Sequence, residues 1–82
     1  MIDVLYFAWL RERIGEPSEQ VETNATTVAE LVEELKTRSE AHALAFSDIA
    51  SVRVAIDQDL SEMSASIDGA REVAFFPPMT GG

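Results

Sequence analysis

The two ends of the chain carry its two most apolar segments, and this arrangement limits the folds that are open to it. The first segment is IDVLYF over residues 2–7, and the second is EVAFF over residues 72–76. Both are rich in β-branched and aromatic residues, and the first is apolar at nearly every position, which is typical of a strand buried on both faces. We therefore expect the first and last strands to lie side by side in the middle of one sheet.

Side chains alternate along a strand, so each of these two segments presents one set of residues to the core and another set to the opposite face. The set that we expect in the core is Ile2, Val4, Tyr6, Val73 and Phe75. The set that we expect on the other face is Leu5, Phe7, Ala74 and Phe76. An apolar cluster left exposed on that face would indicate an interface with another protein.

One segment between the two strands has a clear helical signal. Thr27 and Glu30 form a capping-box pattern, in which the threonine hydroxyl accepts from the backbone of Glu30 and the glutamate reaches back. The apolar residues that follow recur at the spacing of one helix face, and they are Val28, Leu31, Val32 and Leu35. The pattern predicts an amphipathic helix that begins after Thr27 and fades after Arg38.

The remaining segments give weaker signals. Residues 11–17 predict a turn, because they contain a glycine and a proline, and residues 19–23 predict a short strand that forms a hairpin with the first. Residues 39–51 are alanine-rich and predict a loop with room for a short helical turn. Residues 52–56 predict a half-buried strand, followed by a turn at residues 57–59 and a short strand near Leu60.

These elements predict one domain of the α+β class, in which a mixed sheet of four to five strands packs on one main helix. A chain of 82 residues has room for a single core and no second domain. We place the domain at residues 1–76 and an extended tail at residues 77–82.

The charge of the chain argues against several classes of partner. There are 15 acidic and 6 basic residues, for a net charge of −9, so phosphate backbones and anionic membranes would be repelled. We expect neither nucleic acid nor a membrane as a partner. Either a basic protein surface is the partner, or the acidity only keeps the protein in solution. Because the start of the chain lacks the pattern of a signal peptide, the expected compartment is the cytoplasm.

Few residues are candidates for catalysis. The chain has no cysteine, which excludes thiolate chemistry and disulfides, and its single histidine, His42, is expected to be an ordinary surface or loop residue. Asp57 and Asp59 are more typical of a solvated turn than of an acid/base pair or a metal site, so no metal is expected. Tyr6 and Trp9 beside Phe7 fit either a binding patch or the rim of the core.

The C-terminal segment FFPPMTGG is the remaining candidate. Pro77 and Pro78 favour an extended rod with a rise of about 3.1 Å per residue, which would carry the next four residues, Met79, Thr80, Gly81 and Gly82, away from the domain. Two glycines are slim enough to enter a narrow channel. The carboxylate of Gly82 is a poor electrophile, so it must be activated, for instance as an acyl adenylate. The alternative is a frayed terminus without a function.

The chain resembles the small, sulfur-carrier subunits of molybdopterin synthase, which are ubiquitin-like β-grasp proteins. The resemblance rests on YFAWLRERIG near the start and on EVAFFPPMTGG at the end. Two further segments, TVAELVEEL and AIDQDL, stand where the family has its helix and its third strand. The similarity spans essentially the whole chain, and it implies a ubiquitin-like β-grasp fold.

The resemblance implies a function for the tail. Gly82 would be adenylated by an ATP-dependent, ubiquitin-activating-like enzyme and converted to a thiocarboxylate. The tail would then enter the active site of the large synthase subunit and give its sulfur to cyclic pyranopterin monophosphate, and two transfers would build the dithiolene of molybdopterin. ATP would be used by the activating enzyme, this chain would bind no cofactor, and the catalytic side chains would belong to its partners.

The resemblance also assigns docking roles to Arg11, Leu60 and Phe76, and the strand alternation adds Phe7 to the same surface. The other interpretation of Phe76 is that it covers the edge of the core. Three other functions stay open, namely a sulfur carrier for thiamine thiazole or another sulfur pathway, a ubiquitin-like modifier that forms isopeptide bonds, and an interaction module whose tail is inert.

Overall fold

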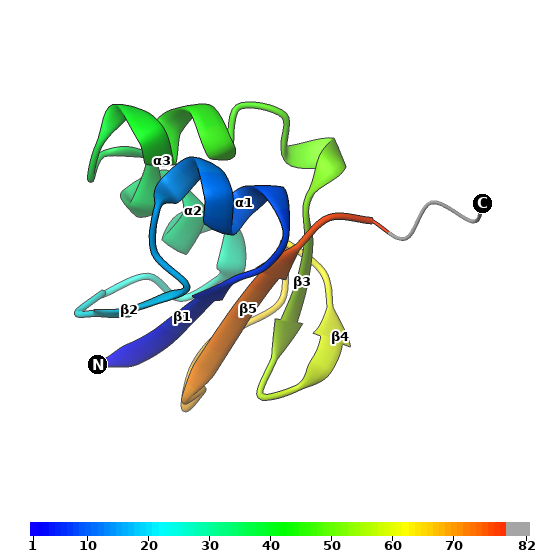
Figure 1. The fold of residues 1–82 in the computed structure, drawn as a ribbon. Helices are drawn as coiled ribbons and strands as arrows, with labels where there is room; N and C mark the ends of the chain where they lie inside the picture. The colour runs from blue at the N-terminus through cyan, green and yellow to red at the C-terminus, as the bar shows by residue number, and fades with distance from the viewer. Residues whose placement is uncertain (79–82) are drawn as a thin grey trace.

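A computed structural model of the protein describes residues 1–78, which form three short helices on one side of a mixed sheet (Figure 1). In chain order the elements are β1 (Ile2–Tyr6), α1 (Trp9–Ile14), β2 (Ser18–Val21), α2 (Val28–Lys36), α3 (Glu40–Ala45), the 3₁₀ turn η1 (Ile49–Ser51), β3 (Arg53–Ile56), β4 (Asp59–Ser61) and β5 (Glu72–Phe76). The strand order is β2-β1-β5-β3-β4. None of the described helices is long and apolar enough to cross a membrane.

The two terminal strands are neighbours at the centre of the sheet, as their composition predicts. β1 runs parallel to β5, with Leu5 opposite Ala74 and Tyr6 opposite Phe75. β2 pairs with β1 and β3 pairs with β5, both antiparallel, so the sheet is mixed. The short strand expected near Leu60 is β4, which forms a hairpin with β3.

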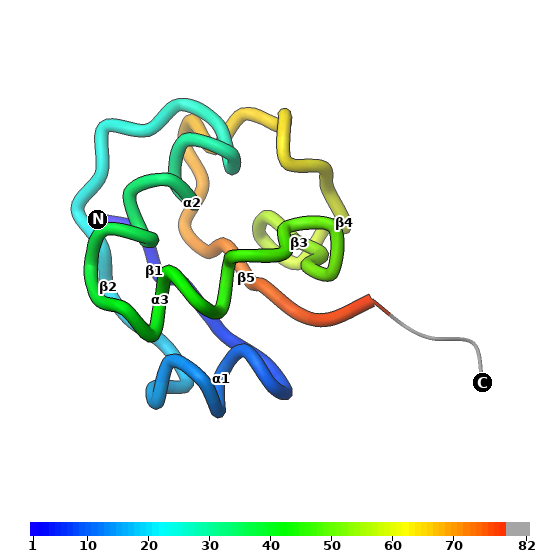
Figure 2. The backbone as a smooth tube through the Cα atoms, turned by 90° about the horizontal axis from the view of Figure 1, so that it is seen from above, coloured from blue at the N-terminus to red at the C-terminus, as the bar shows by residue number. Residues whose placement is uncertain are grey.

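Within residues 1–78 the helices cover only one face of the sheet, which corrects the expectation that the first strand is buried on both faces. Figure 1 shows the three helices on the same side of the strands, and Figure 2 shows α1 at the end of β1, apart from α2. The side chains of the covered face are buried, and they include Ile2, Val4, Tyr6, Val54, Val73 and Phe75. On the other face of β1, Asp3 is exposed and Leu5 is half-buried. This uncovered side is called the open face below.

The helix expected after Thr27 is α2, and its apolar stripe is buried as predicted. The Thr27 hydroxyl accepts from the backbone N–H of Glu30 at 3.2 Å. The Glu30 carboxylate reaches one residue further back than a capping box requires, and accepts from the backbone and the hydroxyl of Thr26 at 2.7 and 2.6 Å. These bonds lower the pKa of Glu30 from its ordinary value.

Two helices form where the sequence predicts a turn and a loop. α1 occupies part of the turn expected at residues 11–17, and it ends where Gly15 adopts a left-handed φ of 91°. α3 occupies the loop expected at residues 39–51 and is capped by Ser39. Each helix is too short for a periodic pattern, yet Leu10 of α1 and Phe46 after α3 are fully buried, so tertiary packing stabilises both.

Candidate partner surface and tail

An apolar row crosses the open face through four strands in register. Leu5 on β1 pairs with Ala74 on β5, Ala74 pairs with Ala55 on β3, and Ala55 pairs with Leu60 on β4. Residues paired in this way lie on the same face of a sheet. Leu60 at the end of the row is 75% exposed. Leu5 and Ala55 are half-buried and Ala74 is 7% exposed, so Leu60 is the one widely exposed member of an apolar row that no described helix covers.

A second apolar pair lies at the end of the sheet from which the tail leaves. Phe7 follows β1, where its backbone N–H donates to the carbonyl of Phe75 at 3.1 Å, and its side chain is 47% exposed. Phe76 ends β5 opposite Arg53 and is half-buried, so it faces the open side as the alternation predicts while it also covers part of the sheet. We call the six residues Leu5, Phe7, Ala55, Leu60, Ala74 and Phe76 the sheet patch.

Arg11, the remaining predicted docking residue, lies on α1 and is exposed. It lines one hollow together with Phe7 and Leu5, at the side of the sheet where β2 forms the edge. Leu60 lies on β4 at the opposite edge of the sheet. The predicted docking residues are thus spread across one surface, with Phe7 and Arg11 close together and Leu60 at the other side.

The tail continues directly from the central strand β5. Pro77 and Pro78 are half-buried and line a groove with Trp9 and Arg13 of α1 and with Asp48 and Ser51 near η1. The predicted tail residues Met79, Thr80, Gly81 and Gly82 lie outside the described residues. Trp9 itself packs partly against the core, which fits its predicted place at the rim.

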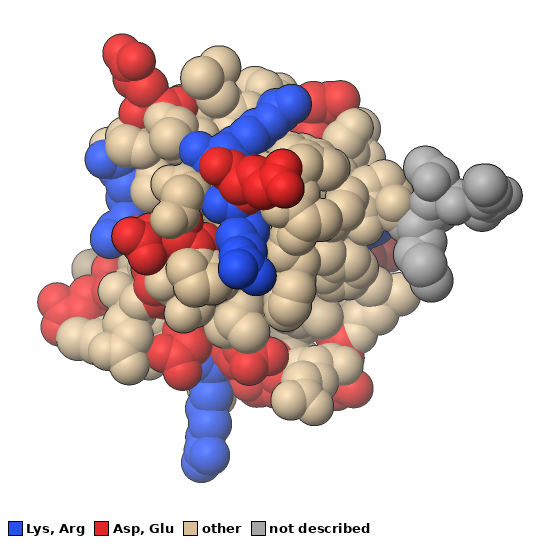
Figure 3. Space-filling model, in the orientation of Figure 1, with Lys and Arg blue, Asp and Glu red and all other residues tan. Residues whose placement is uncertain are grey.

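Three arginines lie on α1 and at the start of β3, interspersed with acidic residues such as Glu12 and Asp48. Arg11, Arg13 and Arg53 are three of the six basic residues, and among the described residues no carboxylate lies within ion-pair distance of them. Arg53 donates instead to the carbonyls of Ala50 and Val52 at 2.9 and 3.2 Å. Figure 3 shows acidic and basic side chains mixed over the centre of the face that carries α1, with uncharged side chains to the right, toward the end of β5.

His42 is a buried residue, contrary to the prediction that it lies at the surface. Its Nε2 atom lies 2.7 Å from Oε2 of Glu19, and its Nδ1 atom lies 2.7 Å from the hydroxyl of Ser39. The Tyr6 hydroxyl donates to the same Glu19 oxygen at 2.8 Å. The cluster lies between β1, β2 and α3, and the sequence signal for it was weak because Glu19 and His42 are 23 positions apart.

The cluster shifts the pKa values of two of its members. Burial raises the pKa of the Tyr6 hydroxyl well above its usual value, and the hydrogen bond to Glu19 raises it further. Burial by itself would raise the pKa of Glu19, but hydrogen bonds to His42 and Tyr6 and the nearby Arg38 hold it below its ordinary value. An ionised carboxylate can only accept, so Nε2 of His42 carries the hydrogen that it shares with Glu19.

The other candidates for chemistry have structural roles. Asp57 Oδ1 accepts from the backbone N–H groups of Arg71 and Glu72, each at 3.0 Å, and Asp59 begins β4. Within residues 1–78 no three His, Cys, Asp or Glu side chains are grouped so that they could hold a metal ion. Asp57 therefore holds the β3–β4 turn against the start of β5, and Asp59 pairs with Ile56 in the hairpin, as the interpretation of a turn predicts.

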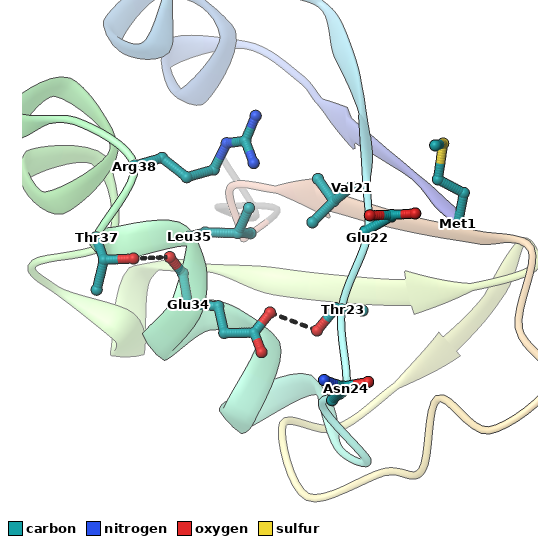
Figure 4. Close-up of a pocket in the computed structure, with 9 residues that line it drawn as sticks. All are labelled: Met1, Val21, Glu22, Thr23, Asn24, Glu34, Leu35, Thr37 and Arg38. Carbon is teal, nitrogen blue, oxygen red and sulfur yellow. Dashed lines mark hydrogen bonds between the residues drawn. The ribbon is translucent and has the colours of Figure 1, made fainter.

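A further hollow among the described residues lies next to Met1, away from the end of β5 (Figure 1). It measures about 700 Å³ and is lined mainly by polar groups. Figure 4 shows that Glu34 is already engaged there, since its carboxylate accepts from the Thr23 hydroxyl and its carbonyl accepts from the Thr37 hydroxyl. This hollow is separate from the sheet patch and from the tail.

Comparison with known proteins gives the family. A family model described as the ThiS family matches residues 4–82. The chain belongs to the ThiS family. This ThiS-family chain is 38% identical to the molybdopterin synthase sulfur carrier subunit of Haemophilus influenzae and 38% identical to that of Escherichia coli, in each case over 100% of both chains. These matches confirm the resemblance to sulfur-carrier subunits, which rests on the motifs near the two ends of the chain.

Solved structures confirm the ubiquitin-like fold of this ThiS-family chain. The crystal structure of SAMP1 from Haloferax volcanii superposes with a TM-score of 0.74 at 22% identity, covering 99% of this chain and 98% of that chain. A putative molybdopterin converting factor, subunit 1, from Pyrococcus furiosus superposes with a TM-score of 0.72 at 25% identity, covering 95% of this chain and 97% of that one.

Proposed function

We propose that this protein is the sulfur-carrier subunit of a molybdopterin synthase and that Gly82 carries the sulfur. The observation that carries the proposal is the match, over the full length of both chains, to two relatives named molybdopterin synthase sulfur carrier subunits. The fold supports it, because the chain leads from the central strand β5 directly into Pro77 and Pro78, next to Phe76 of the sheet patch.

The proposed chemistry takes place on the α-carboxylate of Gly82. The carboxylate attacks the α-phosphate of ATP on an activating adenylyltransferase, which releases pyrophosphate and leaves an acyl adenylate. Hydrosulfide from the sulfur source then displaces AMP and leaves a thiocarboxylate. The thiocarboxylate sulfur attacks a carbon of cyclic pyranopterin monophosphate and displaces an oxygen substituent, which forms a thioester. Hydrolysis of its acyl C–S bond returns the Gly82 carboxylate and leaves the sulfur on the precursor, and two such cycles supply the two sulfurs of the dithiolene.

The partners in this proposal are the large synthase subunit and the adenylyltransferase. We assign the docking of the large subunit to Phe7, Arg11, Leu60 and Phe76. Apolar side chains at the centre of an interface carry most of its binding energy, and an arginine at the rim supplies orientation. The tail from Pro77 to Gly82 would then reach the partner's active site, where the catalytic side chains and the precursor are held.

Mass spectrometry of the intact protein tests the carrier function. The protein is incubated with ATP, the activating enzyme and a sulfur source, and replacement of oxygen by sulfur adds about 16 Da, a change that methionine oxidation also produces. Tandem fragmentation must therefore place the added mass at Gly82. If the mass at Gly82 stays unchanged in the complete reaction, the protein is not a sulfur carrier.

A second assay tests the pathway. The thiocarboxylated protein is mixed with the large synthase subunit and cyclic pyranopterin monophosphate, and we expect molybdopterin to form. A protein that is sulfurated but yields no molybdopterin would serve thiazole formation or another sulfur pathway. A protein that becomes linked through Gly82 to lysine side chains, with no sulfur transferred, would be a modifier.

A further inference from the structure

The groove at the base of the tail has no role in the function proposed above. Six residues line it, namely Trp9, Arg13, Asp48, Ser51, Pro77 and Pro78, around a volume of about 510 Å³. It is formed by α1, by the segment around η1 and by the first two residues after β5. These elements lie on the helix side of the molecule, whereas the sheet patch lies on the open face. We call it the tail-base groove.

The groove has an aromatic wall that holds a positive charge. The guanidinium carbon of Arg13 lies 4.9 Å from the centre of the Trp9 ring, in cation–π contact. Among the described residues, no carboxylate pairs with Arg13. The charge is therefore oriented by the ring and available to a partner.

The opposite wall offers an acceptor. The Oδ2 atom of Asp48 accepts from the Ser51 hydroxyl at 2.8 Å, and the Asp48 side chain is exposed. A carboxylate has room for further donors, such as the N–H groups of an extended peptide. The groove thus presents a cation for an acidic side chain, a flat aromatic surface, and an acceptor for peptide N–H groups.

The position of the groove points to the occupant. Pro77 and Pro78 form part of its wall, so it is continuous with the segment that a partner must enclose when it takes the tail. A protein that contacts only the sheet patch would leave the helix side of the proline pair open to water. A channel around the tail needs a wall on both sides.

We propose that the tail-base groove is a second docking site for the large subunit, occupied by an extended acidic segment of that subunit. A carboxylate of this segment pairs with Arg13, its backbone donates to Asp48, and it closes the tail channel on the helix side. The proposal rests on the proposed function, since it assumes that the large subunit accepts the tail.

Arg13→Glu and Arg71→Glu make a matched pair for the binding test. Both residues are exposed and neither has a described ion pair, and both changes take the net charge from −9 to −11. Arg71 precedes β5, at the end of the strand away from the tail. We expect Arg13→Glu to weaken the complex with the large subunit about tenfold at low salt, and Arg71→Glu to change it less than twofold.

Trp9, the only tryptophan of the chain, supplies a direct probe. The carrier is labelled with 5-fluorotryptophan, and the single ¹⁹F resonance is recorded in light and heavy water with and without unlabelled large subunit. We expect the solvent isotope shift to decrease in the complex, because the segment covers the ring. An unchanged isotope shift in a saturated complex would overturn the proposal. Equal weakening of the complex by the two arginine changes would also overturn it, because it would indicate charge repulsion at a distance.

Other occupants give other results, each of which also overturns the proposal. A resonance of the free protein that moves when residues 79–82 are deleted means that the tail itself fills the groove. A resonance that moves with the concentration of the carrier alone means that a second copy fills it. If the wild-type carrier and the large subunit form no complex, the proposed function fails. That result does not depend on the two arginine variants.

Discussion

The Nε2 atom of His42 lies 2.7 Å from Oε2 of Glu19, and this contact ties helix α3 to the edge strand β2 through the interior of the protein. Tyr6 on β1 donates to the same oxygen, and Arg38 lies 3.4 Å from the other oxygen of the carboxylate. One glutamate therefore joins three separate parts of the fold. The side chain of Glu19 is 16% exposed and that of His42 is 9% exposed, so water competes little for these bonds.

Replacement of His42 by leucine should destabilise the protein. The change removes one partner of Glu19 and leaves a largely buried carboxylate with fewer hydrogen bonds, which costs about 1–3 kcal/mol. The free energy of unfolding in urea measures the effect. Glu19→Leu should cost more than His42→Leu, because it also removes the acceptor of the buried Tyr6 hydroxyl. A single variant as stable as the wild type would show that the contact contributes nothing.

Acid should lower the stability of the folded protein by protonating Glu19. Its pKa is lower in the folded protein than in the unfolded chain, so the stability that it contributes is complete well above the unfolded value and disappears as the pH falls through the folded value. As the pH drops below the unfolded pKa of a glutamate, about 4.3, we expect the free energy of unfolding to fall more steeply in the wild type than in Glu19→Gln. Parallel pH profiles of the two proteins would contradict this account.

Glycine should stabilise the turn between β3 and β4 at only one of two positions. Asp57 and Gln58 both have positive φ, 48° and 73°, which is unfavourable for residues with a Cβ. We expect Gln58→Gly to raise the free energy of unfolding by about 0.5–1 kcal/mol. Asp57→Gly is the control and should lower it, because the Asp57 carboxylate accepts from Arg71 and Glu72. Equal changes in the free energy of unfolding in the two variants would refute the role assigned to the Asp57 carboxylate.

Substitutions at two exposed leucines can distinguish an effect on docking from an effect on stability. Leu60 of β4 is 75% exposed on the open face, and Leu44 of α3 is 64% exposed on the helix side. Leu60→Ala should weaken the complex with the large synthase subunit about tenfold. Leu44→Ala should bind like the wild type, and both variants should keep the wild-type melting temperature. Equal binding by the two variants would place the interface elsewhere.

Deletion of Gly82 should abolish sulfur transfer and leave the stability of the domain unchanged. The core is formed by described residues no later than Phe75, so the free energy of unfolding should stay within about 0.5 kcal/mol of the wild-type value. Circular dichroism during urea titration and the molybdopterin assay are measured on the same sample. A large loss of stability would show that the tail packs on the domain.

The fold was predictable wherever a segment carried its own periodic signal. The apolar character of β1 and β5 placed them at the centre of the sheet, and the stripe from Val28 to Leu35 gave α2. By contrast, α1 has one fully buried residue, Leu10, and α3 has His42 among its buried residues, so neither shows a stripe. These short helices depend on contacts with segments distant in the sequence, which local patterns do not contain.

The candidate site was predictable to a similar degree. Alternation along β1 and β5 put Phe7 and Phe76 on the open side, but Ala55 joins the apolar row through strand register. Register depends on which strands are neighbours. The tail-base groove combines residues from three regions of the chain, and no single stretch of sequence indicates it.

The parallel pairing of β1 with β5 also has a mechanical consequence. A partner that held the tail, as we propose, would pull on Pro77 along the axis of β5, and β5 is bonded on one side to β1 and on the other side to β3. A pull in that direction loads the hydrogen bonds of both ladders together, in shear, instead of opening them one after another. In the proposed complex, β5 would therefore resist being peeled from the sheet when a partner pulls on the tail.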